Sequence, residues 1–336
     1  MNEKLRDYLA NVPYVGEDAY NELYGIVDNV LKTRRITYPE KARLYYELDI
    51  VKRSGAAKLF LFALNALKGF SADEYCFLAK ENDCFINHFL RLTSVNPVDY
   101  GLQFELFFNP EREDFPKFCF YGKNGTKERL LNNICGYYET AKLITGKDNG
   151  CRYFVDTIGK TKSGIEIDGS NLTAGDIKVA TLSADELAKS GLFEFDVFEY
   201  ERNEVLCRKF SDEEIYDAAI KTVAYKPAII SMKPFDKIVD VTRILSRTCG
   251  RLIFQEQVVE ILSDVCGYDP AVADRIRKSI CTKKTDYDGD IAVILRCKYG
   301  IAGEEFFKYL AEYGPYTVSE SYVIAKIKND IVWEKK

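Results

Sequence analysis

The spacing of hydrophobic residues predicts helices through the first fifth of the chain. Two apolar stripes recur at steps of three and four residues, as on one face of a helix: Leu23, Ile26, Val27 and Leu31, then Leu44, Tyr45, Leu48 and Val51. Pro39 suits the first turn of the second helix, and Gly55 suits its end. The apolar run 56–67 is long enough to predict a buried helix rather than a strand.

The pattern changes between residues 95 and 200. Turn signals at Asn96-Pro97 and Asn109-Pro110 precede a segment, 117–121, that we expect to be extended. Helical spacing returns over 126–142, and residues 151–197 are rich in short runs typical of strands.

The last third is again helical in pattern. Asp269-Pro270 is a good pair for the N-cap and first turn of a helix, and an apolar stripe lies ahead of it: Phe254, Val258, Ile261, Leu262 and Val265. The change from β-rich to helical sequence places a boundary near 200–212. We therefore predict an α+β fold with a mixed sheet, organised as a helical lead-in (1–37), an α+β domain (38–205) and a helical domain (206–336).

Composition narrows the functions to consider. The 336 residues include 47 Lys and Arg against 52 Asp and Glu, a net charge of −5, which argues against a broad electrostatic grip on DNA but allows a local basic stripe. The ten cysteines occur without a CxxC pair and His88 is the sole histidine, so a zinc site is not expected. Scattered single cysteines, an N-terminus without an apolar core and the lack of a span of about 20 apolar residues predict a soluble, cytoplasmic protein.

Two groups of motifs stand in order along the chain. The first runs from Leu92-Thr93 through Asn96-Pro97, Tyr100-Gly101-Leu102 and Phe104-Glu105 to Asn109-Pro110-Glu111-Arg112; the second is Thr248-Cys249-Gly250 followed by Gln255-Glu256-Gln257. In spacing they resemble the catalytic subunit of the bacterial replicative, or C-family, DNA polymerases (DNA polymerase III alpha). The resemblance implies a polymerase beta-like palm at 38–205 and a helical fingers-like domain at 206–336, with the thumb largely deleted.

The same resemblance locates the catalytic positions. The family holds two magnesium ions with three aspartates, and here Lys117 and Cys119 stand at the first two of these positions, while Asp196 keeps the third. Two-metal phosphoryl transfer requires clustered carboxylates that hold cations about 4 Å apart, and a lysine supplies charge of the wrong sign. The family's glycine-rich triphosphate turn is replaced by 79–85, which contains no glycine. The resemblance therefore implies a catalytically inactive pseudo-polymerase without a cofactor.

Two further groups of residues are candidates for binding. The family's helix over nucleotide and template implies a nucleic-acid-binding set, for which a solvated helix face is the alternative: Arg275, Arg277, Lys278, Lys283 and Lys284. Gln255 and Glu256 are also candidate nucleic-acid contacts, and a hydrogen-bond role at the start of a helix is their alternative. The acidic turn Asp286, Asp288 and Asp290 resembles a magnesium loop of multisubunit RNA polymerases, and a polar loop between helices is its alternative. Asn109 to Arg112 is also interpreted as a turn held by an Arg–Glu pair.

Three functional hypotheses follow. The first is a non-catalytic accessory protein that binds nucleic acid or replication proteins. The second is an active DNA-directed DNA polymerase, a nucleotidyltransferase with Mg²⁺ on a rearranged site made of Asp196 with Glu194 or Asp168. The third is a phage or mobile-element protein that interferes with a host replisome. The sequence leaves open which hypothesis holds, whether DNA is bound at all, which partners are involved and the oligomeric state.

Overall fold

The structure is a computed structural model that describes most of the two ends of the chain and part of its middle. The described residues are 3–10, 12, 14, 16–112, 116, 118–123, 125–126, 129–130, 132–133, 141–147, 151–157, 193–200, 211–224, 227–282 and 288–332. Over these ranges helices predominate and a single mixed sheet is present, which confirms the α+β class.

Four helices form the N-terminal part: α1 (Glu3–Ala10), α2 (Ala19–Leu31), α3 (Tyr38–Ser54) and α4 (Ala57–Ala66). The start of α3 carries a capping box, in which Thr37 and Glu40 satisfy each other's free backbone N–H groups. Gly55 ends α3 with φ 72°, a left-handed conformation that glycine adopts without strain. The predicted helices in this part, including the buried one at 56–67, are confirmed.

The sheet has five strands in the order β1-β2-β5-β4-β3: β1 (Tyr75–Phe77), β2 (Phe118–Lys123), β3 (Ala141–Lys147), β4 (Cys151–Thr157) and β5 (Phe193–Tyr200). β2 and β5 are parallel and the other pairs are antiparallel, so the predicted mixed sheet is confirmed. The predicted helix over 126–142 is wrong at Ala141 and Lys142, which belong to β3, and residues 134–140 lie outside the described residues. The predicted strands between 158 and 192 lie outside the described residues.

Short elements connect β1 to β2 and carry the first group of motifs: the 3₁₀ turn η1 (Lys80–Asp83), α5 (Phe85–Phe89), α6 (Pro97–Tyr100) and α7 (Phe104–Phe107). Phenylalanines pack this region edge to face. Phe118 of β2 lies 5.4 Å from Phe77 and 5.6 Å from Phe107, between ring centroids.

The C-terminal part of the described chain is helical, as predicted: α10 (Asp212–Ala224), α11 (Pro227–Ile230), α12 (Val239–Ile244), η3 (Ser246–Thr248), α13 (Gln255–Glu260), the π turn η4 (Ile261–Val265), α14 (Pro270–Cys281), α15 (Asp288–Tyr299), α16 (Ile301–Tyr313), η5 (Gly314–Tyr316) and α17 (Glu320–Val332). The predicted cap is confirmed, because Asp269 accepts a hydrogen bond from the backbone N–H of Ala271 and Pro270 begins α14.

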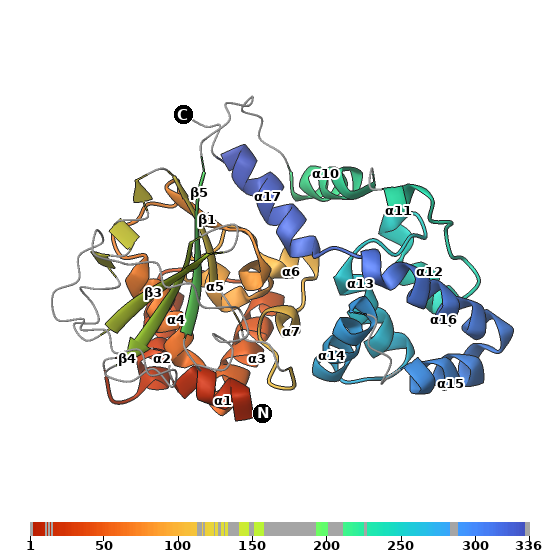
Figure 1. Ribbon diagram of the computed structural model, residues 1–336, viewed down its shortest axis with the longest axis horizontal. Coiled ribbons are helices and arrows are strands. Elements are labelled where there is room, and N and C mark those ends of the chain that lie inside the picture. Colours follow the sequence, from red (N-terminus) through yellow and green to blue (C-terminus); the bar gives the residue numbers. More distant parts are fainter. Residues whose placement is uncertain are drawn as a thin grey trace.

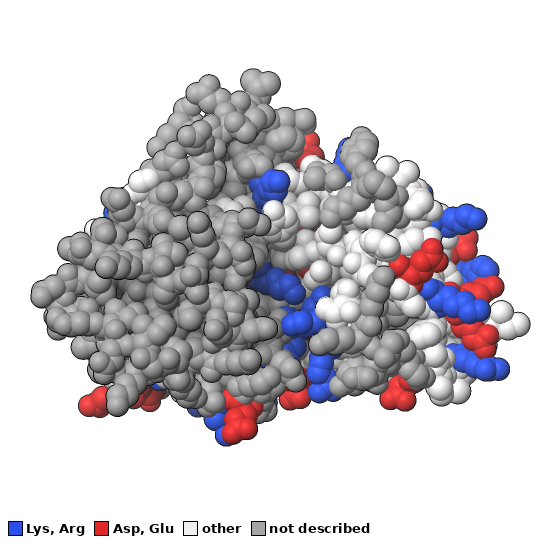
Figure 2. All heavy atoms as spheres, viewed as in Figure 1, with Lys and Arg blue, Asp and Glu red and all other residues white. Residues whose placement is uncertain are grey.

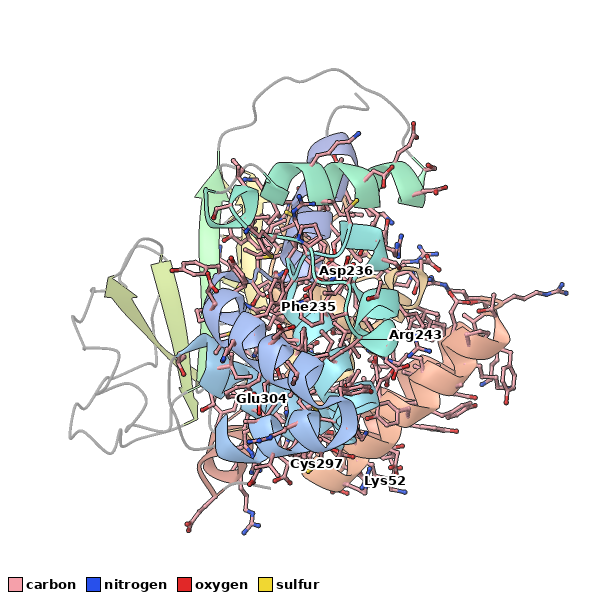
Figure 3. All side chains as sticks on the ribbon, turned by 90° about the vertical axis from the view of Figure 1, so that its right-hand side faces the viewer. Lys52, Phe235, Asp236, Arg243, Cys297 and Glu304 are labelled. Atoms are coloured by element: carbon pink, nitrogen blue, oxygen red, sulfur yellow. The ribbon has the colours of Figure 1, made fainter. Side chains whose placement is uncertain are left out.

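Two hydrophobic cores meet between the N-terminal and C-terminal parts. The first core lies under the sheet and α1–α5, and the second holds α10–α17 together. Four residues of the connecting segment belong to the second core: Val95, Tyr100, Leu102 and Leu106. Conversely, α17 of the C-terminal part lies between the two parts in Figure 1. It packs on η1 of the N-terminal part as well as on α10. Viewed from the side, the C-terminal helices lie in front of the first part, and the sheet projects beyond them (Figure 3).

None of the helices in the described ranges is long and apolar enough to cross a membrane. The predicted domain boundary near 200–212 falls largely on 201–210, which lie outside the described residues, and it stays a prediction.

Candidate functional site

Cys119 and Asp196 lie side by side in the sheet. They are register partners in the parallel pair of β2 and β5, so the fold joins two of the three positions at which the resemblance places metal ligands. Cys119 is half-buried, and its backbone N–H donates a hydrogen bond to Oε1 of Glu81. Lys117, the third position, lies outside the described residues.

Glu81 belongs to η1, the turn that replaces the glycine-rich segment. Glu81, Asn82 and Asp83 are all completely buried. The Asn82 amide donates to the carbonyl oxygens of Phe77 (2.9 Å) and Ala79 (3.0 Å) and so holds the turn closed. A glycine-rich turn presents free N–H groups to phosphate, whereas this turn is filled by its own side chains and adds two carboxyl groups.

Further carboxyl groups from the C-terminal helices surround η1. Ser321 at the start of α17 donates to Oδ2 of Asp83 (3.0 Å), and the backbone N–H of Glu320 donates to Oε2 of Glu256 (2.9 Å). Burial and the nearby Glu256 raise the pKa of both Asp83 and Glu320 well above their usual values, and burial also raises the pKa of Glu256. The raised pKa values favour the neutral form of these carboxyl groups.

A cationic network adjoins the acidic one and ties the Asn109–Arg112 turn to α14. Asp274 is fully buried and accepts hydrogen bonds from Arg112 Nη1 (2.9 Å), Arg277 Nε (2.8 Å) and Asn109 Nδ2 (3.2 Å). The predicted Arg–Glu pair within the turn is wrong, because Arg112 turns inward to Asp274. Glu111 instead faces Arg275, at 4.0 Å.

We call these two adjoining networks the polar junction, defined by Lys80, Glu81, Asp83, Arg112, Glu256, Asp274, Arg277 and Glu320. It lies where the two hydrophobic cores meet. The N-terminal part and the C-terminal part of the chain each contribute both acidic and basic residues to it.

Comparison with known proteins identifies the family. Residues 16–148 match the family model for the bacterial DNA polymerase III alpha NTPase domain, and residues 152–295 match that for the bacterial DNA polymerase III alpha subunit finger domain. The chain is a C-family polymerase alpha-like protein. The predicted resemblance is confirmed.

Individual relatives cover shorter stretches of this polymerase alpha-like chain. It is 27% identical over 157 residues to DNA polymerase III subunit alpha of Borreliella burgdorferi, which is 42% of this chain and 13% of that protein. It is 31% identical over 142 residues to the same subunit of Vibrio cholerae (38% and 11%) and 33% identical over 89 residues to the error-prone DNA polymerase of Symbiobacterium thermophilum (24% and 8%). The matches thus span between 8% and 13% of these relatives' own length.

The predicted nucleic-acid-binding residues of the polymerase alpha-like chain have different environments. Arg277 is only 3% exposed and donates to Asp274 and to Oε1 of Gln255, so the alternative of a solvated helix face is wrong for this residue. Arg275 and Lys278 are half-buried on α14. Lys283 and Lys284 lie outside the described residues. Nucleic-acid contact by this set stays a prediction.

The predicted acidic metal turn is described only in part. Asp286 lies outside the described residues, Asp288 begins α15, and Asp290 is exposed. Across the ranges that the structure describes, no group of three His, Cys, Asp or Glu side chains is arranged to hold a metal ion.

The resemblance predicts that η1 replaces a triphosphate turn, but sequence reasoning missed the positions of Lys80, Asp83 and Glu320 in the polar junction. Lys80 is half-buried in the polar junction. Burial and the charges of Arg277 and Arg112 lower its pKa to about 7. The absence of glycine from 79–85, together with the charged residues in this segment, was the available signal.

Lys80→Met is expected to raise the free energy of unfolding by about 1–2 kcal/mol at pH 6, because the folded chain then no longer buries a cation beside two arginines. Since the folded pKa is lowered, the unfolded state binds more protons between pH 7 and about 10.4, and the wild type gains stability as pH rises through that window. The advantage of the variant should therefore shrink by pH 9.5. Urea unfolding at both pH values measures it, with exposed Lys41→Met as control. An equal gain at both values would contradict the explanation.

Proposed function

We propose that this C-family polymerase alpha-like chain is a non-catalytic protein of DNA replication that binds nucleic acid or replication proteins. The observation that carries the proposal is the filled site around Cys119. Lys117 and Cys119 stand at two of the three metal-ligand positions that the resemblance implies. The backbone N–H of Cys119 donates a hydrogen bond to the Glu81 carboxylate.

Elementary electrostatics supports the absence of polymerase chemistry. Two magnesium ions in one site need several carboxylate oxygens, and Asp196 supplies one carboxylate. Asp83, Glu256 and Glu320 fill the space next to η1 with buried carboxyl groups, whereas a triphosphate would need free N–H donors and positive charge there.

A binding role is supported by local charge and by the relatives. Although the net charge is −5, Lys and Arg side chains form a run along the middle of the face drawn in Figure 2. Contacts of Lys and Arg side chains with phosphate groups draw proteins to nucleic acid without sequence preference. The relatives' names concern DNA polymerases, and DNA or its replication proteins are accordingly the partners proposed.

An active nucleotidyltransferase is the second candidate. The observation in its favour is that Asp196 occupies a central strand beside Cys119, in the parallel pair of the sheet. Such an enzyme would need Mg²⁺ on Asp196 with relocated acids, for which Glu194 and Asp168 are the candidates from the sequence.

Primer extension separates the two candidates. With a primed template, all four deoxynucleoside triphosphates and either Mg²⁺ or Mn²⁺, we expect no extension above a protein-free control. Asp196→Asn is the matched control, because it removes the retained metal-ligand position. Extension by the wild type that Asp196→Asn abolishes would overturn the proposal and favour the enzyme.

The binding half is measured on the same protein by fluorescence anisotropy with labelled primed, single-stranded and double-stranded DNA. Affinity that falls steeply with salt is the expected result. If no DNA is bound at low salt, the nucleic-acid half of the proposal fails and replication proteins alone remain as partners.

A further inference from the structure

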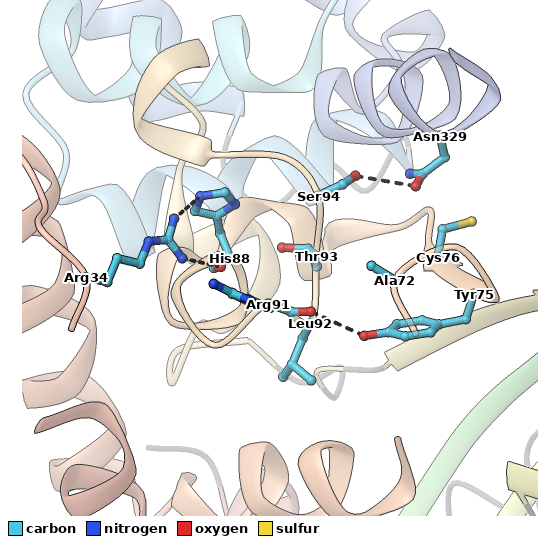
Figure 4. A pocket seen from close by; sticks show the side chains of 10 residues that line it. All are labelled: Arg34, Ala72, Tyr75, Cys76, His88, Arg91, Leu92, Thr93, Ser94 and Asn329. Atoms are coloured by element: carbon cyan, nitrogen blue, oxygen red, sulfur yellow. Dashed lines mark hydrogen bonds between the residues drawn. The ribbon is translucent and has the colours of Figure 1, made fainter. Parts of the chain in front are cut away.

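A cavity separate from the polar junction opens between α5, β1 and α17. Its volume is about 340 Å³, and its walls come from the segment before α3, from β1, from the end of α5 and from α17 (Figure 4). Arg34, His88 and Arg91 lie toward one side of the view, and Tyr75 lies on the other. The cavity is large enough for a small polar ligand.

The charge of this cavity is positive. Arg34 and Arg91 are among the residues that line it, and the lining residues that the structure describes include no aspartate or glutamate. His88 is neutral near pH 7, because burial and the charges of Arg34 and Lys328 lower its pKa to about 4. Glu40 is the nearby acid that acts on His88, and its oxygens accept hydrogen bonds from Thr37 and Asn96.

Arg34 is fixed in place. Its Nη1 donates to the carbonyl oxygens of Phe89 (3.0 Å) and His88 (3.3 Å), and its Nη2 lies 2.8 Å from Nε2 of His88. With His88 neutral, Nε2 is the acceptor in this contact. Arg34 is therefore a positive charge that needs no rearrangement to act on a ligand.

Arg91 is held in an unusual backbone conformation and has an exposed side chain. Its φ is +62°, a left-handed conformation that is strained for a residue other than glycine. The conformation is maintained by a hydrogen bond from the Tyr75 hydroxyl to the Arg91 carbonyl (3.2 Å) and by one from the N–H of Leu92 to the Asn87 carbonyl (2.8 Å). Within the described residues the Arg91 guanidinium forms no ion pair or hydrogen bond.

Thr93 supplies an independent observation. It is 6% exposed, and its buried hydroxyl has no hydrogen-bond partner among the described residues. Leaving such a group unpaired is unfavourable, and a ligand oxygen in the cavity would supply the missing partner.

We propose that this cavity binds the phosphate group of a phosphomonoester. Arg91 supplies a guanidinium fork, Thr93 supplies a hydroxyl, and Arg34 supplies a fixed charge. A phosphomonoester carries close to two negative charges and three peripheral oxygens, which match two guanidinium groups and one hydroxyl better than a carboxylate does. The group comes either from a free nucleotide or from the 5′-phosphorylated end of a nucleic-acid strand. None of the residues that line the cavity belongs to the polar junction, so the site does not depend on the proposed function.

The sole histidine of the chain reports on the site. In NMR spectra of the full chain, adenosine monophosphate or inorganic phosphate should raise the pKa of His88 from about 4 by roughly one unit, because a nearby anion favours the charged imidazole. Arg91→Gly should abolish this rise and weaken binding at least about tenfold, the equivalent of 1.4 kcal/mol. Since glycine adopts φ +62° freely, that variant should unfold no more easily than the wild type.

A second variant, a control variant and one comparison complete the test. Thr93→Val removes only the hydroxyl, and Arg35→Gln removes an equal charge from an exposed neighbour that does not line the cavity. Thr93→Val should weaken binding and Arg35→Gln should not. Tighter binding of a 5′-phosphorylated oligonucleotide than of adenosine monophosphate assigns the strand end, and the reverse order assigns the free nucleotide. The proposal fails if phosphate and adenosine monophosphate up to about 10 mM leave His88 unchanged, if acetate acts equally, or if Arg91→Gly behaves as the wild type.

Discussion

Asp274→Ala is expected to lower the free energy of unfolding by about 3–5 kcal/mol, the cost of leaving buried charges without their partner. Arg112 is 8% exposed and Arg277 is 3% exposed, and both donate to Asp274. In the variant these two guanidinium groups would face each other, with Lys80 nearby, and no carboxylate between them. The variant would therefore weaken the contact that joins the Asn109–Arg112 turn to α14.

The pH dependence of this loss has a defined sign. Burial alone would raise the pKa of Asp274, but Arg277 and Arg112 together lower it below its usual value. A lowered pKa contributes stability that is present above the unfolded value, near 3.9, and is lost as pH falls through the folded value. The difference between wild type and variant should therefore be full at pH 7 and shrink below about pH 4.

Urea unfolding followed by circular dichroism measures the change. Asp290→Ala on α15 is a suitable control, because the Asp290 side chain is exposed and its removal should cost less than about 0.5 kcal/mol. The double variant Asp274→Ala with Arg112→Met should lose less than the sum of the two single variants, as expected for residues in direct contact. A loss under about 1 kcal/mol for Asp274→Ala would show that the network is not stabilising.

Glu47→Ala is expected to have an effect of similar size, about 3–5 kcal/mol, through a different network. Glu47 is fully buried in α3. It accepts hydrogen bonds from Arg43 Nε (2.6 Å) and from the backbone N–H groups of Phe85 (2.8 Å) and Ile86 (2.9 Å). Burial raises the pKa of Glu47, and these three donors oppose the rise. In all three contacts a Glu47 oxygen accepts the hydrogen bond, as in an ionised carboxylate.

The variant would leave Arg43 without its carboxylate and two N–H groups at the start of α5 without an acceptor. Asp49→Ala on the same helix is the matched control. Asp49 pairs with Arg53 at 2.8 Å, but its side chain is 61% exposed, so its loss should cost less than about 0.5 kcal/mol. Similar urea midpoints for the two variants would contradict the importance assigned to Glu47.

Local structure was predictable where local signals determine it. The caps at Thr37 and Asp269 and the left-handed end at Gly55 are set by residues within a few positions of each helix end, and the structure confirms the Gly55 end and the Asp269–Pro270 cap. Hydrophobic spacing sufficed for α2, α3 and the C-terminal helices for the same reason.

The candidate site was predictable only in outline. The motifs identified the positions of Cys119 and Asp196, but hydrogen bonds such as that of Arg112 to Asp274 join residues 162 positions apart. Nothing in the spacing of a single sequence indicates such a pairing. Arg277 illustrates the consequence, since a basic residue in a basic cluster was expected near the surface and is instead buried beside a carboxylate.

The contact between Ser321 and Asp83 has a consequence for biosynthesis. These residues are 238 positions apart, and α17 packs directly on η1. During translation the N-terminal part would emerge with Asp83 and its neighbours still lacking this partner. The first hydrophobic core can assemble early from nearby segments, but its edge at η1 is completed only after α17 has been synthesised. Contacts of such long range slow folding, so we expect the docking of α17 onto η1 to follow the assembly of the first hydrophobic core.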